Sequence, residues 1–524
     1  MNRHTIAALA MNEARLRLRR LSTLLVLLTV IVIFWSIVPN PDTGRFTLIS
    51  VAHARVYYTS AALAMASAKL FAIMFGLAGF YLLRGRMGED LRSGVGSVIA
   101  ATQVSNGLFL FGRWLGGVMY LAGLAAALLA NILVFHSLRG DGPVQPLVYL
   151  QTYLLFLVPV IFFVVSCATL FDSVAALMGK AGDVVYFVFW TLQFPLLDHF
   201  LATADSQFSS WMMFDVSGAG MSLVMLSMKL NLPVSAISKG VTIYSPQLQS
   251  VSLPAVLWGS TMEMSRCATA ALALLPLLPA TVLFHRFSPD RVKAGSTRHW
   301  GSPLRHINRW LRPLSRLISS WPRLAASLPG IWGQAVADVA LCLLASPVAI
   351  AALLLSLVAS LLARTDSLPG VLVTAIAAWG ILISDISTRD FQANTENLTG
   401  VAPGGIMQRY LRHLLAACLL GLLFTGFVAL RWIFLEPLRA AALAVGILSV
   451  SAVATSLGCC SRSARTFLVL FLFWLYIANN VPAAPMLDVV GFNGFANARS
   501  ILIQLGIAVG ASSAGFYYNR GRPA

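Results

Sequence analysis

Long apolar runs separated by short polar segments dominate the pattern along the chain. A membrane-spanning helix needs about 20 predominantly apolar residues, and twelve runs approach that length. The pattern predicts an all-α polytopic membrane protein with twelve membrane-spanning helices. In the first half these are Leu21–Val38, Thr59–Leu83, Trp114–Phe135, Leu147–Leu170, Val184–Phe200 and Cys267–Phe284, and in the second half Leu341–Ala363, Val371–Ile386, Leu414–Phe434, Ala440–Gly458, Thr466–Asn480 and Ile501–Tyr518.

The composition supports this class. Of 524 residues, 58% are hydrophobic and only 11% are charged, whereas soluble domains carry about 25% charged residues. The chain has too little polar surface to coat a water-soluble globule of this size. The composition excludes a soluble enzyme, a disordered chain and a fibrous repeat. The six cysteines form no CxxC pair, and we expect them to be free thiols packed between helices.

The charge distribution predicts the orientation. The net charge is +18, from 37 Lys and Arg against 19 Asp and Glu. Lys and Arg collect in cytoplasmic loops of membrane proteins. Twelve spans place both termini on one side, and that side carries 26 of the Lys and Arg, against ten on the other. We therefore expect a multi-pass protein of a bacterial inner membrane with both termini in the cytoplasm. The basic charge then needs no nucleic acid partner.

The pattern of spans predicts two halves of six spans each, 1–300 and 301–524. A basic, partly amphipathic segment precedes each half. In the connector 303–324, Leu304, Ile307, Leu311, Leu314, Ile318 and Trp321 recur at helical spacing, opposite Arg305, Arg309, Arg312, Arg316 and Arg323. This pattern is typical of a helix in the headgroup layer, although a soluble partner is an alternative. Pro313 and Pro322 should break the helix.

The first half has an external insertion, 201–266, before its sixth span. Within it, Phe214–Leu230 is expected to form a helix. The loops after the second and eighth spans, 88–104 and 388–404, match in position at an offset of 300, which aligns Asp90 with Asp390. These loops favour an internal duplication.

Few residues suggest chemistry. The sequence has no phosphate-binding loop of the GxxxxGK[ST] type and no HExxH or GxSxG motif, so we expect no enzymatic activity in this chain. Lys69 lies near the middle of a span and is a candidate pathway residue, with snorkelling as the alternative. Asp198 and His199, near the outer surface, would be the site of a membrane-embedded transferase, the least favoured class.

The loops carry a resemblance to a known family. Glu89–Val104 followed by Gly112-Arg113, and Arg389–Pro403 followed by Tyr410–Arg412, resemble the acidic loop, turn and basic step of the ABC-2 type permeases. The chain departs from that pattern at Gln103, where the family has proline, and at Arg113, where it has lysine. These permeases are the membrane subunits of ABC transporters.

The resemblance implies a function and partners. This chain would be the permease subunit of an ATP-driven exporter of unknown substrate, working with separate cytoplasmic ATPase subunits that hold ATP and magnesium. It would bind no cofactor itself and would contact membrane lipid. The ATPase-coupling loops would be carried by Glu89, Asp90, Val98, Ile99, Asp390, Glu396, Leu398 and Val401. An ion-coupled secondary transporter is the main alternative, although no clearly buried acidic residue supports it.

Overall fold

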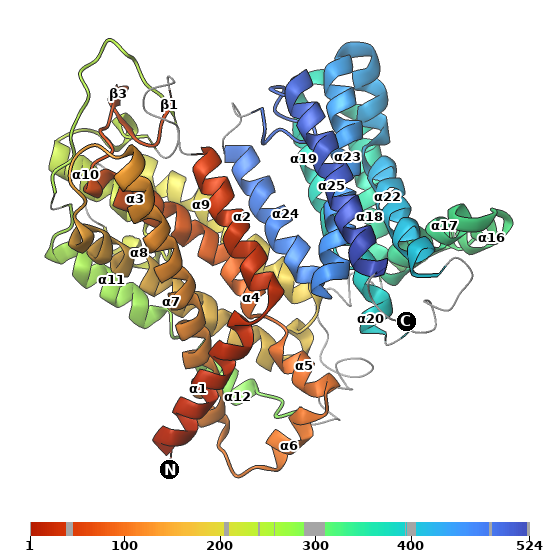
Figure 1. Cartoon of the computed structure of the whole chain (residues 1–524), viewed down its shortest axis with the longest axis horizontal. Coiled ribbons are helices and arrows are strands. Elements are labelled where there is room, and N and C mark those ends of the chain that lie inside the picture. Colours follow the sequence, from red (N-terminus) through yellow and green to blue (C-terminus); the bar gives the residue numbers. More distant parts are fainter. Residues whose placement is uncertain are drawn as a thin grey trace. The chain divides into compact units, whose positions relative to one another are not determined.

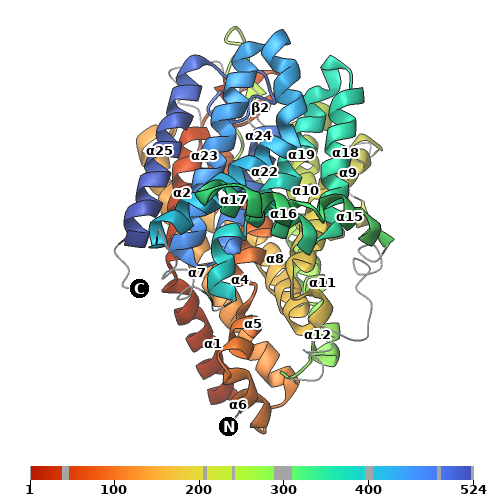
Figure 2. The ribbon, with the colours of Figure 1, turned by 90° about the vertical axis from the view of Figure 1, so that its right-hand side faces the viewer.

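The computed structural model describes residues 2–37, 46–203, 209–238, 242–255, 257–287, 310–393, 395, 405–480 and 485–520. Nearly all of the regular structure is helical, which confirms the all-α class. The chain divides into two compact units, Met1–Trp300 (unit 1) and Gly301–Ala524 (unit 2), drawn in Figures 1 and 2.

Unit 1 consists of long helices joined by shorter ones, with four two-residue strands at one end. Its described elements are α1 (Asn2–Leu18), α2 (Leu21–Ile37), β1 (Phe46–Thr47), β2 (Ser50–Val51), β3 (Ala54–Arg55), α3 (Ser60–Met74), the π-helical turn η1 (Phe75–Gly79), α4 (Phe80–Leu83), α5 (Arg86–Arg92), α6 (Val95–Ala101), α7 (Asn106–Arg139), α8 (Pro146–Ser173), η2 (Ala175–Leu177), α9 (Lys180–Thr203), η3 (Ser210–Phe214), α10 (Ala219–Leu230), η4 (Val234–Ala236), β4 (Thr242–Ile243), α11 (Ser260–Leu272) and α12 (Leu277–Leu283). The strands pair β1 with β4 and β2 with β3, both antiparallel.

Unit 2 begins with short helices and continues with long ones. Its described elements are η5 (Arg312–Leu314), α15 (Ser315–Ile318), α16 (Trp321–Ser327), α17 (Gly330–Ala345), α18 (Pro347–Leu362), η6 (Thr365–Ser367), α19 (Leu368–Ile383), η7 (Ile386–Thr388), α20 (Arg389–Gln392), α22 (Gly405–Leu435), α23 (Pro437–Ser461), α24 (Ala464–Asn480) and α25 (Ala498–Arg520). Helices α22, α23 and α25 pack together, as Figures 1 and 2 both show.

Local sequence signals explain where helices begin and end. Thr59 and Ser105 cap α3 and α7, and their hydroxyls accept hydrogen bonds from the backbone N–H groups of Ala62 and Leu108 at 3.5 and 3.4 Å. Pro146 starts α8, where a missing N–H costs nothing.

Eight helices in the described part of the chain are long and apolar enough to cross a membrane. Each coincides with a predicted span, and together they cover Ser60–Leu91, Asn106–Arg139, Pro146–Ser173, Ser260–Leu283, Thr365–Gln392, Met407–Leu435, Pro437–Ser461 and Ala498–Arg520. The protein is therefore an all-α polytopic membrane protein. Three of the remaining predicted spans each correspond to one helix: α2, α24 and α9. Helices α2 and α24 are apolar but only 17 residues long, and α9 has 24 residues.

The remaining predicted span, Leu341–Ala363, is not one helix, and the expectation of a continuous span is wrong. Helix α17 ends at Ala345, α18 begins at Pro347, and their axes meet at 103°. Ser346 between them is extended, with φ −141° and ψ 102°, because the residue before a proline is disfavoured in the helical region. The proline therefore starts a new helix inside an apolar run.

The centre of unit 1 is the helix that runs from Ser60 to Leu91. Of its apolar window, 83% is buried, against 33% for α7. It packs on α8 (Figure 1), and the rings of Phe80 and Tyr186 stack with centroids 3.5 Å apart. Helix α7 leaves most of its apolar surface open, as expected for a helix that faces lipid.

The amphipathic connector is helical where the structure describes it, from residue 310 onward. It is broken into η5, α15 and α16, with Pro313 and Pro322 in their first turns, so the predicted breaks at both prolines are confirmed. Ile318 is buried while Arg312 and Arg316 are exposed, which agrees with the predicted faces. Residues 303–309 lie outside the described part.

The predicted helix in the external insertion starts later than Phe214. Asp215 ends the turn η3, and its carboxylate accepts hydrogen bonds from the N–H groups of Gly218 at 2.9 Å and Gly220 at 2.8 Å. Gly218 has φ +71°, a conformation that side chains rarely adopt. Helix α10 therefore begins at Ala219.

Candidate functional site

In unit 1 the N-terminal helix α1 lies along α7, and two glycines of α7 allow the close approach. A Cβ on Gly112 would lie 3.0 Å from the side chain of Leu9, and one on Gly116 would lie 2.7 Å from the carbonyl oxygen of Ala10. Larger side chains there would push α1 away. The contact brings Glu13 of α1, which is buried, to the start of α7.

Arginines gather around two buried carboxylates at this place. Glu13 lies 2.6 Å from Arg17, 3.6 Å from Arg86 and 4.0 Å from Arg113. Asp90 forms an ion pair with Arg113 and lies 3.6 Å from Arg86. The five residues come from three helices, α1, α5 and α7, and are named the unit 1 triad cluster after them. The cluster ties those three helices together. Buried charges of this kind persist only when they are paired.

The arginines control the ionisation of Glu13. Burial raises the pKa of Glu13, but the positive charges of Arg17, Arg113 and Arg86 outweigh that effect, so the pKa lies below its ordinary value of 4.5. Glu13 is therefore ionised at neutral pH and holds the arginines in place.

A second buried cluster lies at the same end of unit 1. Arg84, which follows α4, donates to Asp172 of α8 at 2.5 Å and to Asp183 of α9 at 3.1 Å. It also donates to the carbonyl oxygen of Leu177 at 2.5 Å and lies over the ring of Phe80. One guanidinium thus joins the ends of three helices.

Unit 2 contains a smaller version of the triad cluster. Arg412, at the start of α22, lies 3.0 Å from Asp390 of α20 and 3.4 Å from Asp338 of α17. In chain order, these helices correspond to α7, α5 and α1 of unit 1. In each unit, an arginine near the start of a membrane helix (α7 or α22) therefore lies beside two carboxylates. One carboxylate is on the short helix before it (α5 or α20), and the other is on an earlier helix (α1 or α17).

The packing of helices also corresponds between the units. Helix α1 packs on α7 and α17 on α22, α7 packs on α8 and α22 on α23, and α8 packs on α11 while α23 packs on α25. In each unit a glycine faces an aromatic ring: a Cβ on Gly76 would lie 1.8 Å from Trp190 of α9, and one on Gly380 would lie 2.1 Å from Phe471 of α24.

The short helix α6 lies at the end of unit 1 away from the strands, as Figures 1 and 2 show. Ile99 packs against the core cluster that contains Phe284. Val98 points away from that core and is 67% exposed, and Val95 is 47% exposed. Helix α6 therefore presents an apolar surface that unit 1 does not cover.

The segment after α12 holds α6 in place. Arg286 donates to the carbonyl oxygens of Thr102 at 2.8 Å and Val104 at 3.3 Å, and the ring of Phe287 lies 2.8 Å from where a Cβ on Gly96 would be. Arg286 and Phe287 both have positive φ, 45° and 57°, which is strained for residues with side chains. Anchored side chains hold such strain in place.

The structure separates the residues predicted for the coupling loop of unit 1. Val98 is exposed, whereas Ile99 is partly buried. Glu89 lies 2.5 Å from Arg20 and 3.0 Å from Arg86, and Asp90 lies inside the unit 1 triad cluster. The acidic residues expected beside the docking surface are thus engaged in ion pairs within unit 1.

The other predicted residues lie elsewhere. Asp390 belongs to the smaller cluster of unit 2, while Glu396, Leu398 and Val401 fall outside the described residues. Lys69 lies half-buried in the middle of α3. The side chains of Asp198 and His199 are also outside the described part.

Of the residues of these clusters, only Asp90, Arg113, Asp390 and Arg412 were singled out from the sequence, and Glu13, Arg84 and Asp338 are three of those that were missed. Two of them carried a signal. Glu13 stands four residues before Arg17, a spacing that favours an ion pair on a helix. Asp338 is the single acidic residue between Asp290 and Asp366. Arg84 carried none, because its partners are far along the chain.

The clusters contain no nucleophile beside a base, and the described residues include no group of three His, Cys, Asp or Glu side chains placed to hold a metal ion. The ion pairs of the unit 1 triad cluster join α5, the helix before α6, to α1 and α7. No family model, curated protein or solved structure matches the chain.

Proposed function

We propose that the chain is the membrane-spanning permease subunit of an ATP-driven exporter of the ABC-2 type. It would form the substrate pathway and couple to separate ATPase subunits. The observation that carries the proposal is α6. This helix follows the membrane helix Ser60–Leu91, the place at which the resembled family has its coupling helix, and it exposes Val98 and Val95.

The rigid mounting of α6 supports a coupling role. Arg286 and Phe287 hold it from one side, and Ile99 fixes it to the core. Helix α5, directly before it, is tied to α1 and α7 through the unit 1 triad cluster. A partner that pushed on α6 would therefore move membrane helices rather than bend a loop.

A duplicated architecture of twelve spans is part of the proposal. The corresponding helix contacts, the two carboxylate–arginine clusters and the two glycine–aromatic contacts support it. In this arrangement α2, α9, α18 and α24 complete six spans in each unit, and α1 and α17 are the corresponding helices that precede the first span.

The proposed orientation places both termini in the cytoplasm of a bacterial cell. Two observations support it. The charge split favours that side, and α6 lies at the opposite end of unit 1 from the strands, which belong to the segment between α2 and α3 and to the external insertion (Figure 1). The ATPase surface and the insertion would then face opposite sides of the membrane.

The test compares the substitution of two neighbouring residues of α6, Val98 and Ile99, by aspartate. Val98→Asp should leave the protein inserted and stable, because the side chain is 67% exposed, but should weaken binding of the ATPase. Burying such a side chain contributes about 1.5–3 kcal/mol, which corresponds to roughly tenfold to a hundredfold in affinity. Ile99→Asp is the control, and should lower the yield of folded protein instead.

Copurification of the ATPase with tagged, full-length protein measures the effect. Wild-type recovery of the ATPase with Val98→Asp would overturn the assignment of α6 as the coupling helix. Transport by wild-type protein that stops with a protonophore and persists without ATP would overturn the ATP-driven mechanism and favour the ion-coupled alternative.

A further inference from the structure

The connector at the start of unit 2 leaves a row of apolar side chains uncovered. Trp310, Leu317 and Leu324 are 87%, 60% and 51% exposed. They stand seven residues apart, which is about two helical turns, so they share one side of the connector. Large apolar side chains exposed together mark a surface that contacts a partner or a membrane.

This row differs from the apolar face that the sequence predicts. Ile318 is buried, and Leu314 and Trp321 are half-buried, because η5 packs on α18 while α15 and α16 pack on α17. Unit 2 itself therefore covers the predicted face. At 3.6 residues per turn, the exposed row lies between this covered face and the arginines of the connector.

The charge of the connector is positive only. Arg312, Arg316 and Arg323 are exposed, and 310–337 contains no Asp, Glu or Lys. No residue of the part that the structure describes forms an ion pair with any of these three arginines. Exposed apolar side chains beside uncompensated arginines fit a partner that is both apolar and negatively charged.

The bend between α17 and α18 sets the direction of the connector. The axes of these two helices meet at 103°. Figures 1 and 2 show α16 and α17 running across the long helices α18, α19 and α22 rather than along them. Because α19 and α22 belong to helices that are long and apolar enough to cross a membrane, α16 and α17 run close to the membrane plane.

Helix α22 gives the depth of the connector. Asp338 of α17 lies 3.4 Å from Arg412, which precedes Leu435, the end of α22, by 23 positions. This stretch is about 35 Å long at 1.5 Å per residue, whereas the hydrocarbon core is about 30 Å thick. Helix α17 therefore meets α22 at headgroup depth.

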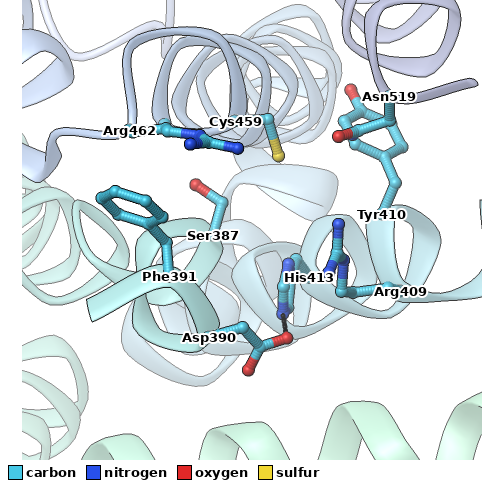
Figure 3. A pocket seen from close by; sticks show the side chains of 10 residues that line it. Ser387, Asp390, Phe391, Arg409, Tyr410, His413, Cys459, Arg462 and Asn519 are labelled. Carbon is cyan, nitrogen blue, oxygen red and sulfur yellow. Dashed lines mark ion pairs between the residues drawn. The ribbon is translucent and has the colours of Figure 1, made fainter. Parts of the chain in front are cut away.

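The surroundings of the first turns of α22 agree with this depth. Figure 3 shows polar and charged side chains gathered there, among them Asp390, Arg409 and His413. Charged side chains are costly within hydrocarbon, so this end of α22 lies among headgroups or in water. Trp332 on α17 is exposed, as is Trp310, and tryptophan is enriched at the membrane interface.

We propose that the connector binds a membrane surface that contains anionic phospholipid. The exposed apolar row enters the boundary between headgroups and acyl chains, and the three arginines bind the phosphate groups. A zwitterionic surface lacks the net negative charge that would balance these arginines. The inference depends on the membrane class of the protein and not on an ATPase partner.

The experiment uses the full-length protein in a cysteine-free background, reconstituted into lipid nanodiscs. An environment-sensitive fluorophore is attached to Leu317→Cys in the row, or to Ser319→Cys, an exposed position on the opposite side of the connector. A phospholipid with a nitroxide near its headgroup should quench the first label more strongly, and iodide in the water should quench the second. If iodide alone quenches the Leu317→Cys label, or neither quencher does, the row faces water or protein and the proposal is overturned.

Charge variants test the class of lipid. Replacing phosphatidylcholine with phosphatidylglycerol should shift the emission of the Leu317→Cys label to shorter wavelength. Exchange of the three arginines for glutamine should raise the share of phosphatidylglycerol that gives half of this shift by about fivefold or more, because one arginine beside an anionic surface already contributes about that factor in affinity. These variants are Arg312→Gln, Arg316→Gln and Arg323→Gln, combined in one protein.

The matched control combines Arg312→Lys, Arg316→Lys and Arg323→Lys, which keeps the charge and should keep the response. All three side chains are exposed, so both triple variants should unfold in detergent at the temperature of the wild type. An equal response of the wild type to the two lipids, or an unchanged response in the glutamine variant, would overturn the assignment of anionic lipid.

Discussion

At the residue scale, buried arginines decide how the helix ends of unit 1 are joined. Arg84 is 2% exposed and binds two carboxylates from different helices. Removing one partner of a buried ion pair leaves the other charge uncompensated, which costs about 3–5 kcal/mol.

We therefore expect Arg84→Ala to destabilise the protein strongly. The variant leaves Asp172 and Asp183 buried without their cation. Thermal unfolding in detergent measures the effect, with the exposed Arg323→Ala as the control, which should change stability by less than about 0.5 kcal/mol. Equal unfolding temperatures for the two variants would contradict the structural role of Arg84.

The ionisation of the buried Glu13 should make the stability of the protein depend on pH. Its folded-state pKa is lowered below 4.5 because Arg17, Arg113 and Arg86 outweigh the effect of burial. A group with a lowered folded-state pKa stabilises the protein above its unfolded-state pKa, and that stability is lost as the pH falls through the folded-state value.

The stability of the wild type should consequently fall as the pH drops below about 4.5. Glu13→Gln cannot ionise, so it should be less stable than the wild type at neutral pH, and the difference should shrink in acid. Unfolding temperatures of both proteins between neutral pH and acid measure this. A difference that stays constant with pH would refute the contribution of Glu13.

At the element scale, glycines determine how closely the membrane helices pack. Gly76 lies in the π-helical turn η1, and its carbonyl oxygen accepts a hydrogen bond from the hydroxyl of Tyr186 at 2.6 Å. The ring of Trp190 occupies the place where a side chain on Gly76 would lie. Helix α9 can therefore approach η1 only because residue 76 is glycine.

Gly76→Ala should displace Trp190 and destabilise the protein by about 1–3 kcal/mol, as overpacking does. Gly123→Ala is the matched control, since nothing lies within 4 Å of a Cβ at that position of α7. The control should be neutral or slightly stabilising, because alanine favours helix over glycine by about 1 kcal/mol. Thermal unfolding of both variants checks this, and equal values would argue against the close packing at Gly76.

In unit 2 we expect an alanine at position 380 to destabilise the protein in the same way. Gly380→Ala would place a Cβ 2.1 Å from Phe471, whereas Gly426→Ala on α22 meets nothing. We expect the first variant alone to lower the yield of folded protein. Matching effects of Gly76→Ala and Gly380→Ala would also support the duplication, because the two glycines occupy corresponding helices.

At the scale of the whole molecule, the distribution of charge predicts the topology. In a cysteine-free background, a membrane-impermeant thiol reagent added to intact cells should label Gln249→Cys in the external insertion. It should spare Ser319→Cys in the connector until the cells are opened. The reverse pattern would invert the orientation, and labelling of both in intact cells would place the insertion and the connector on one side.

The sequence determined the class of the protein and most of its membrane helices. Apolar runs of about 20 residues are a local property, and bilayer thickness fixes their length, so eight predicted spans coincide with long apolar helices. The proline breaks in the connector follow equally from local chemistry, since proline limits the backbone of its own residue and the one before it. By the same rule Pro347 favours a break within Leu341–Ala363. The continuous apolar run there favoured a single span instead, and that prediction was wrong.

Only the tertiary structure decided which residues meet. Glu13 and Asp90 are 77 positions apart, and Arg84 and Asp183 are 99 positions apart. No spacing rule links them, because helix packing and not chain distance brings them together. The two faces of α6 are a similar case: Val98 and Ile99 are adjacent and apolar, and only the packing of Phe284 and Phe287 buries one and leaves the other exposed.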